Sequence, residues 1–170
     1  QTSYGIESGY SSNIFTGDAV ELHTDGTITV GAAGATNLIG VFNGCFYTDS
    51  TGKPTYSKYW PASTVASDAV AFVIDDPNVV FEAQEDSTNI GASWPDNRGS
   101  NADLVSTHAG STKTGRSGQE LDSSSITAAT AQFRIVDVVS DEYNNETSSA
   151  NGNYLVRINE GLHYANTAGI

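Results

Sequence analysis

Apolar residues in this chain alternate with polar ones at the spacing of β-strands, and the helical spacing of i, i+3, i+4 and i+7 is not sustained anywhere. The first clear case is a pair of alternating segments, residues 19–22 and 27–30. They flank Asp25-Gly26, a dipeptide typical of tight hairpin turns. The pattern therefore predicts a β-hairpin at residues 19–30.

Two further hairpins are predicted before the middle of the chain. Residues 38–48 are rich in aromatic and β-branched side chains, and a turn signal at 49–54 separates them from a partner strand at 55–60. Residues 65–74 are the most apolar strand, and the Asp-Asp-Pro-Asn turn that follows predicts 79–83 as its hairpin mate. Residues 131–139 and 154–158 predict two later strands, so the chain is expected to be all-β and antiparallel.

A long polar stretch interrupts this pattern at about residues 86–125. Its large apolar residues are few, and they are Ile90, Trp94, Leu104, Val105 and Leu121. Loops longer than about 12–15 residues in a compact domain are usually functional or disordered. We therefore predict a long polar loop insertion within a single β domain that spans residues 17–170.

The first sixteen residues carry large side chains spaced by Gly and Ser. These are Tyr4, Ile6, Tyr10, Ile14 and Phe15. The spacing suits an extended N-terminal arm, residues 1–16, that places its side chains in the grooves of a neighbouring molecule. The alternative is an N-terminal strand that covers the domain's own core.

Charge and size narrow the possible functions. The chain has 170 residues, room for one domain, and 20 acidic against 7 basic residues give a net charge of -13. The basic residues form no run, so direct nucleic-acid binding is excluded. The longest apolar stretch, residues 69–74, is far shorter than the roughly 20 residues that span a bilayer. The N-terminus has no signal-peptide pattern, and no membrane association is predicted.

Candidate chemistry is sparse. The three histidines have no metal-ligand spacing, and Ser117 lies in a Gly-x-Ser-x-Gln sequence that lacks the last glycine of a hydrolase elbow. Cys45 is the single cysteine and lies in an apolar strand, which predicts a buried, inert thiol and excludes an internal disulfide. No catalytic residue, cofactor or metal is predicted, with a weak calcium site in the acidic loops as the alternative.

Both tryptophans directly precede prolines, which favours an extended conformation at the edge of a structural element. Trp60 is expected in the core. Trp94 lies inside the polar stretch, and there an interface is expected.

Several segments resemble the head decoration, or cement, proteins of tailed bacteriophages. The segments are residues 17–22, the Asp25-Gly26 turn, and residues 39–45, 56–62, 69–77 and 156–164. The resemblance covers most of the chain, and its motifs concern the fold rather than chemistry. This chain is longer than the smallest decoration proteins, and the polar stretch at about 86–125 is the expected insertion.

The resemblance implies a virion structural protein without catalytic residues, built on a small β-barrel or β-tulip core and assembled as a homotrimer. Such a protein folds in the bacterial host cytoplasm, binds the outer face of an icosahedral capsid, and clamps adjacent subunits of the major capsid protein. An N-terminal arm is expected to augment a capsid strand. The candidate capsid or subunit interface residues are Tyr4, Ile6, Tyr10, Ile14, Phe15 and Trp94.

Two other function classes remain open at this point. A carbohydrate-binding or adhesive β module on a virion or cell surface would stack Trp60, Trp94 and tyrosines on sugar rings. A hydrolase based on acidic residues would need two coupled carboxylates in a cleft, and the sequence singles out no such pair.

Overall fold

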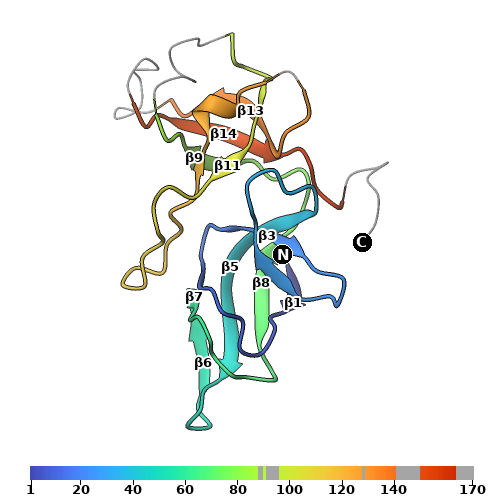
Figure 1. The fold of residues 1–170 in the computed structure, drawn as a ribbon, viewed down its shortest axis with the longest axis vertical. Helices are drawn as coiled ribbons and strands as arrows, with labels where there is room; N and C mark the ends of the chain where they lie inside the picture. The colour runs from blue at the N-terminus through green and yellow to red at the C-terminus, as the bar shows by residue number, and fades with distance from the viewer. Residues whose placement is uncertain (88–89, 91–95, 128, 141–149, 164–170) are drawn as a thin grey trace.

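The computed structural model describes residues 1–87, 90, 96–127, 129–140 and 150–163, and its strands form two main sheets and two short ribbons (Figure 1). The predicted all-β class is confirmed. A 3-10 turn, η1, spans Ser123–Ser125. Within the described residues, no helical segment has the length and apolar character needed to cross a bilayer.

The larger sheet has the order β1-β8-β5-β3-β4, and β6 also pairs with β5. All of its pairings are antiparallel. Its strands are β1 (Thr2–Gly5), β3 (Ala19–Leu22), β4 (Ile28–Val30), β5 (Leu38–Thr48), β6 (Pro54–Ser57) and β8 (Val70–Ile74).

Local signals correctly predicted the hairpin of β3 and β4 and the strand β5. In the turn between β3 and β4, the backbone amide of Thr27 donates to the Asp25 carboxylate at 2.9 Å, and Gly26 has a φ of 82°. A positive φ is strained for most side chains, which explains the glycine. The predicted pairing of residues 38–48 with the following strand is confirmed for β6, whereas β7 (Tyr59–Trp60) pairs with β2 (Ile14–Phe15) instead.

The predicted hairpin of residues 65–74 with 79–83 is wrong. Strand β8 pairs with β1 on one edge and with β5 on the other, so neither edge is left for the next strand. The chain instead turns at Asp76, whose carboxylate accepts the amide of Asn78 at 2.8 Å, and crosses to the smaller sheet. That sheet has the order β10-β13-β14-β9, formed by β10 (Asn101–Ala102), β13 (Phe133–Val138), β14 (Asn153–Ile158) and β9 (Phe81–Gln84).

The expectation of a free N-terminal arm is corrected by the structure. Strand β1 forms an edge of the larger sheet, and Ile6 and Ile14 are buried in a core with Phe42, Trp60 and other residues of that sheet. The β2-β7 ribbon places Ile14 opposite Trp60, and Trp60 contacts Tyr47 edge-on with ring centroids 5.3 Å apart. The N-terminal segment therefore covers the chain's own core, as the alternative stated.

The polar stretch at 86–125 is also not a loop in its described part. It contains β10, β11 (Leu104–Val105) and β12 (Glu120–Leu121), and the last two pair with each other. Ile90, Leu104 and Leu121 are buried in a second core together with the inner face of the smaller sheet. Few apolar residues are enough to bury this stretch, because β9, β13 and β14 supply many of the side chains of the second core.

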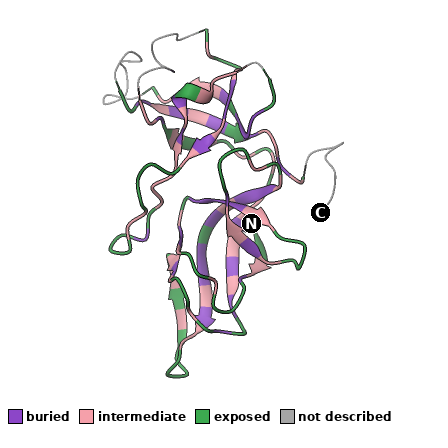
Figure 2. Cartoon of the chain, in the orientation of Figure 1, coloured by how far each residue is buried: buried purple, intermediate pink, exposed green. Residues whose placement is uncertain are grey.

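The buried side chain of Gln132, which directly precedes β13, links the smaller sheet to the loop between β4 and β5 and to β11. The Gln132 side chain accepts the amides of Gly34 and Leu104, both at 3.0 Å, and donates to the Ala32 carbonyl at 2.8 Å. Figure 2 shows buried residues within the strands of both sheets and exposed ones along the loops and β6. A single bridge between Gly5 and Thr27 brings the edges of the larger sheet together, but the described strands form no closed barrel.

Candidate functional site

The outer face of the larger sheet carries an apolar row across three neighbouring strands. Phe46 of β5 pairs with Tyr56 of β6 on one side and with Val70 of β8 on the other. The rings of Phe46 and Tyr56 lie 4.9 Å apart, and Tyr56 is 78% exposed. None of the three belongs to either core, since their neighbours Cys45, Tyr47 and Ala71 point inward. We call Phe46, Tyr56 and Val70 the outer apolar row.

Part of the same face is covered by the smaller sheet. Val41, which precedes Phe42 on β5, lines a cleft of about 160 Å³ with Ala19, Phe81, Leu104, Phe133 and Val156, among other residues. Antiparallel sheets usually bury one face and present polar side chains to water on the other. Here β5 and β8 carry apolar side chains on both faces, and Phe46, Tyr56 and Val70 do not line the cleft. Tyr56 is exposed whereas Phe46 and Val70 are half-buried, so a partner that covers Tyr56 would complete the burial of the row.

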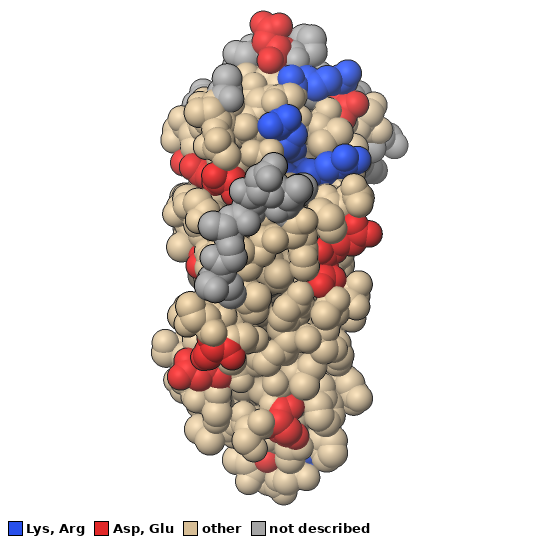
Figure 3. All heavy atoms as spheres, turned by 90° about the vertical axis from the view of Figure 1, so that its right-hand side faces the viewer, with Lys and Arg blue, Asp and Glu red and all other residues tan. Residues whose placement is uncertain are grey.

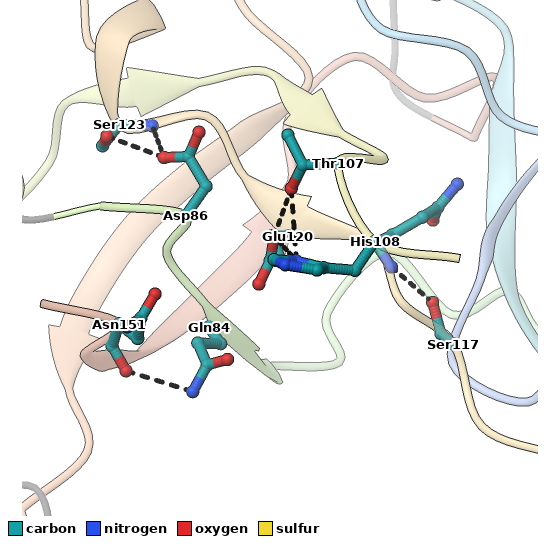
Figure 4. Close-up of polar contacts among 9 residues, drawn as sticks. Gln84, Asp86, Thr107, His108, Ser117, Glu120, Ser123 and Asn151 are labelled. Atoms are coloured by element: carbon teal, nitrogen blue, oxygen red, sulfur yellow. Dashed lines mark hydrogen bonds and ion pairs between the residues drawn. The ribbon is translucent and has the colours of Figure 1, made fainter. Parts of the chain in front are cut away.

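A polar hollow of about 500 Å³ lies beside this cleft, lined by Gln84, His108, Ser117, Glu120 and Asn151, among others (Figure 4). The Glu120 carboxylate accepts the Thr107 hydroxyl at 2.6 Å and lies 3.0 Å from His108 Nδ1. The Glu120 side chain is 9% exposed and that of His108 74%. A largely buried carboxylate thus lies within hydrogen-bond distance of an exposed imidazole.

In the part of the chain that the structure describes, this His–Glu pair does not extend to a nucleophile. The Ser117 hydroxyl donates to Asp18 at 2.5 Å and accepts the Gln119 amide at 2.9 Å, rather than bonding to the imidazole. A serine nucleophile needs a base within hydrogen-bond reach of its own hydroxyl. Among the described residues, the hollow therefore does not assemble the pair that acyl transfer requires.

Asp18 connects the N-terminal segment to residues 106–121 through hydrogen bonds of its carboxylate. Besides Ser117, its buried carboxylate accepts the backbone amide of Phe15 at 2.7 Å. Burial raises its pKa, while these two hydrogen bonds act in the opposite direction. Gln119 makes a second connection, to residues 19 and 31. Its side chain accepts a hydrogen bond from the Ala19 amide at 2.7 Å and donates one to the Gly31 carbonyl at 3.1 Å. The side chains of Asp18, Ser117 and Gln119 therefore have a structural role, which is to hold these segments together.

Glu85 is a fully buried carboxyl group at the end of β9. One oxygen, Oε2, accepts the Ile90 amide at 3.0 Å, whereas Oε1 has no hydrogen-bond partner among the described residues. Burial raises the pKa of Glu85 and outweighs the hydrogen bonds with the backbone of Ile90 and Gly152, which lower it, while the nearby charge of Asp86 raises it slightly. The group is therefore protonated more readily in the folded than in the unfolded chain.

We expect the variant Glu85→Gln to be more stable than the wild type at pH 7 and not at pH 4. The pKa of Glu85 is higher in the folded than in the unfolded chain, so its protonation stabilises the wild-type fold. This stabilisation is fully present below the unfolded-state pKa and is lost as the pH rises through the folded-state pKa. Removing the charge should gain on the order of 1 kcal/mol at pH 7. Thermal unfolding at both pH values measures this, with Glu82→Gln as the exposed control on the same strand. Destabilisation of Glu85→Gln at pH 7 would contradict this account.

The sequence-predicted interface residues are not gathered on one surface. Ile6 and Ile14 lie in the core, and Phe15 is buried against Gly110 and stacked on Tyr59 with ring centroids 5.5 Å apart. Tyr4 and Tyr10 pack against the first core, where the Tyr4 hydroxyl donates to Asp75 at 2.9 Å and the Tyr10 hydroxyl accepts the Val30 amide at 3.2 Å. Trp94 lies outside the described residues. The three buried side chains cannot reach a partner in this fold.

Other expectations can also be compared with the structure. Trp60 and Cys45 are buried as predicted, and burial raises the pKa of the Cys45 thiol to about 12. Among the described residues, no three His, Cys, Asp or Glu side chains gather as a metal site. Asp86 accepts both the amide and the hydroxyl of Ser123. The acidic loop at 141–146, part of the calcium alternative, lies outside the described residues.

The outer apolar row was missed at the level of sequence, although a signal was present. Residues 70–74 form an unbroken apolar run, which is typical of a strand with apolar side chains on both faces. Comparisons with family models, curated proteins and solved structures found no match. The site is therefore interpreted from its geometry.

Proposed function

We propose that this protein is a capsid decoration protein, which binds the outer surface of an icosahedral phage head and clamps adjacent major capsid protein subunits. The outer apolar row is the observation that carries the proposal. Tyr56, Phe46 and Val70 lie in register across three strands, on a chain whose net charge is -13. Burying such a row against a partner is favourable by roughly 25 cal/mol per Å² of apolar area.

Clamping requires a stable, preformed surface and no chemistry. The row is mounted on paired strands, so little conformational entropy is lost when a partner binds. Polar groups of the neighbouring hollow hydrogen-bond to one another, as the Gln119 amide does to the Ser117 hydroxyl. The negative charge favours solubility of a protein that is present in many copies. A homotrimer on the outer face of the virion is part of this proposal.

The mode of attachment differs from the one expected from the sequence. Because Ile6, Ile14 and Phe15 are buried within the chain, the proposed contact uses a sheet face rather than an N-terminal arm. In this arrangement the capsid subunits cover Tyr56 and its neighbours on β5 and β8.

A carbohydrate-binding or adhesive module is the second candidate, and exposed Tyr56 favours it, because an exposed aromatic ring can stack on a sugar. Two features weigh against it. The Tyr56 ring is tilted by 52° against Phe46, and the row continues from Phe46 into aliphatic Val70 rather than into a second exposed aromatic ring.

Binding assays with the isolated protein separate the two candidates. The decoration proposal predicts saturable co-sedimentation with expanded, undecorated shells of the major capsid protein from the same genome, and no binding on a glycan array. Added protein should also raise the temperature at which the shells disrupt. Glycan binding without shell binding would contradict the proposal and support the second candidate.

A further inference from the structure

Two arginines lie directly opposite each other on the smaller sheet. Arg134 of β13 and Arg157 of β14 are register partners, and both side chains are exposed. Opposite residues of an antiparallel pair point to the same face, with Cβ atoms about 4.5–5.5 Å apart. Like charges so placed destabilise strand pairing. Pairing of the strands therefore does not explain these two side chains.

The surroundings hold Arg134 in place without neutralising it. Its Nε donates to Asn101 Oδ1 at 2.6 Å, and its Nη2 donates to Asn159 Oδ1 at 3.2 Å. Both amides are themselves fixed, because Asn101 Nδ2 donates to the Ala129 carbonyl and Asn159 Nδ2 to the Ala131 carbonyl. Neutral oxygens thus orient a guanidinium that keeps its full charge.

Neither arginine has a carboxylate within ion-pair distance among the described residues. The ion pairs found there are those of the N-terminus, Arg98, His108 and His163, and neither Arg134 nor Arg157 takes part in one. Arg98 differs, since it lies 2.6 Å from Asp137. Figure 3 shows Lys and Arg gathered in the upper part of the visible face, with acidic groups both beside them and along the rest of the face.

We infer that Arg134 and Arg157 form a binding site for the carboxylates of a short acidic segment of a partner protein. The planar guanidinium presents paired N–H donors that match the two oxygens of a carboxylate. Nη1 of Arg134 and the guanidinium of Arg157 are the groups that would donate. This site uses residues distinct from the outer apolar row, so either proposal can fail while the other holds.

A carboxylate partner fits this surface better than a nucleic acid. Nucleic-acid affinity comes mainly from many lysines and arginines that displace counterions, and this site offers two arginines on a chain with a net charge of -13. Long-range repulsion opposes a long phosphate backbone. A short acidic segment places only a few charges at the site and leaves the rest of the acidic surface untouched.

The test uses the full chain labelled with 15N and a tetraglutamate peptide at low salt. We expect saturable shifts of the Arg134 and Arg157 Nε–H signals. The double variant Arg134→Gln with Arg157→Gln should weaken binding by about tenfold or more, the effect expected when charge-assisted hydrogen bonds are lost. The matched control is Lys113→Gln with Arg116→Gln, which removes the same charge from an exposed turn. It should bind within about threefold of the wild type, because screening weakens distant charges.

Parallel titrations with inorganic phosphate and a single-stranded oligonucleotide identify the anion. If phosphate and the oligonucleotide both bind more weakly than the tetraglutamate peptide, the result supports a carboxylate-binding site. If either binds more tightly than the peptide at the same two arginines, the result overturns that assignment. Absence of saturable shifts, or an equal loss in the control variant, overturns the site itself. Backbone amide spectra show whether each variant keeps the wild-type fold.

Discussion

Deleting residues 1–16 is expected to abolish the cooperative thermal unfolding of this protein. The deletion removes β1, which pairs with β8 at four positions, and the buried side chains of Ile6, Ile14 and Phe15. Full burial of such a side chain contributes about 1.5–3 kcal/mol, so the three together contribute roughly 5–9 kcal/mol. That is comparable with the whole stability of a typical domain, about 5–15 kcal/mol.

Scanning calorimetry measures this directly. The control is the variant Ser11→Ala with Ser12→Ala, which changes two exposed residues of the same segment and should shift the unfolding free energy by about 0.5 kcal/mol at most. If the truncated chain instead unfolds cooperatively within a few degrees of the full chain, residues 1–16 are a separable arm and the burial described above does not stabilise the fold.

The sequence predicts those parts of the fold that depend on neighbouring residues. The hairpin of β3 and β4 follows from the Asp25-Gly26 turn, and the bounds predicted for β5 are those observed. Partners distant in sequence are not encoded locally. Nothing in residues 75–80 indicates that β8 already has two partners, so a strong turn signal was interpreted as a hairpin.

Burial of scattered apolar residues is equally hard to predict. Ile6 and Ile14 stand among Gly and Ser, and the distant strands that cover them cannot be inferred from that segment alone. Ile90, Leu104 and Leu121 are sparse in a polar stretch but join a core that β9, β13 and β14 largely supply. Composition alone therefore suggested a loop where the chain forms short strands.

The candidate surfaces differ in what the sequence could reveal. The continuous apolar run of β8 indicates a strand with two apolar faces, so part of the outer apolar row could have been predicted. The partnership of Arg134 with Arg157 depends on strand register, which is distorted by a bulge between Ile135 and Asp137. The basic residues are dispersed along the sequence, so the sequence alone does not indicate that Arg134 and Arg157 lie opposite each other.

The variant Tyr56→Ser with Val70→Thr is expected to lose capsid binding while it keeps its fold. Tyr56 is exposed and Val70 half-buried, so both substitutions cost the free chain little. At an interface, truncating a central aromatic or aliphatic anchor typically costs about 2 kcal/mol or more. The two changes together should weaken binding by at least about thirtyfold.

The matched control is Val80→Ser, which removes an apolar side chain that is 39% exposed and lies beside β9 of the smaller sheet. It should bind shells as the wild type does. Equal losses in both variants would indicate non-specific hydrophobic adhesion rather than a defined docking face.

The affinity of the Tyr56→Ser, Val70→Thr variant for expanded capsid shells, relative to that of the wild type, measures whether the outer apolar row is the docking face. A folded variant whose dissociation constant rises at least about thirtyfold, beside an unchanged Val80→Ser control, is the result predicted here. A folded variant that binds and stabilises shells as well as the wild type would contradict the assignment of the outer apolar row as the docking face.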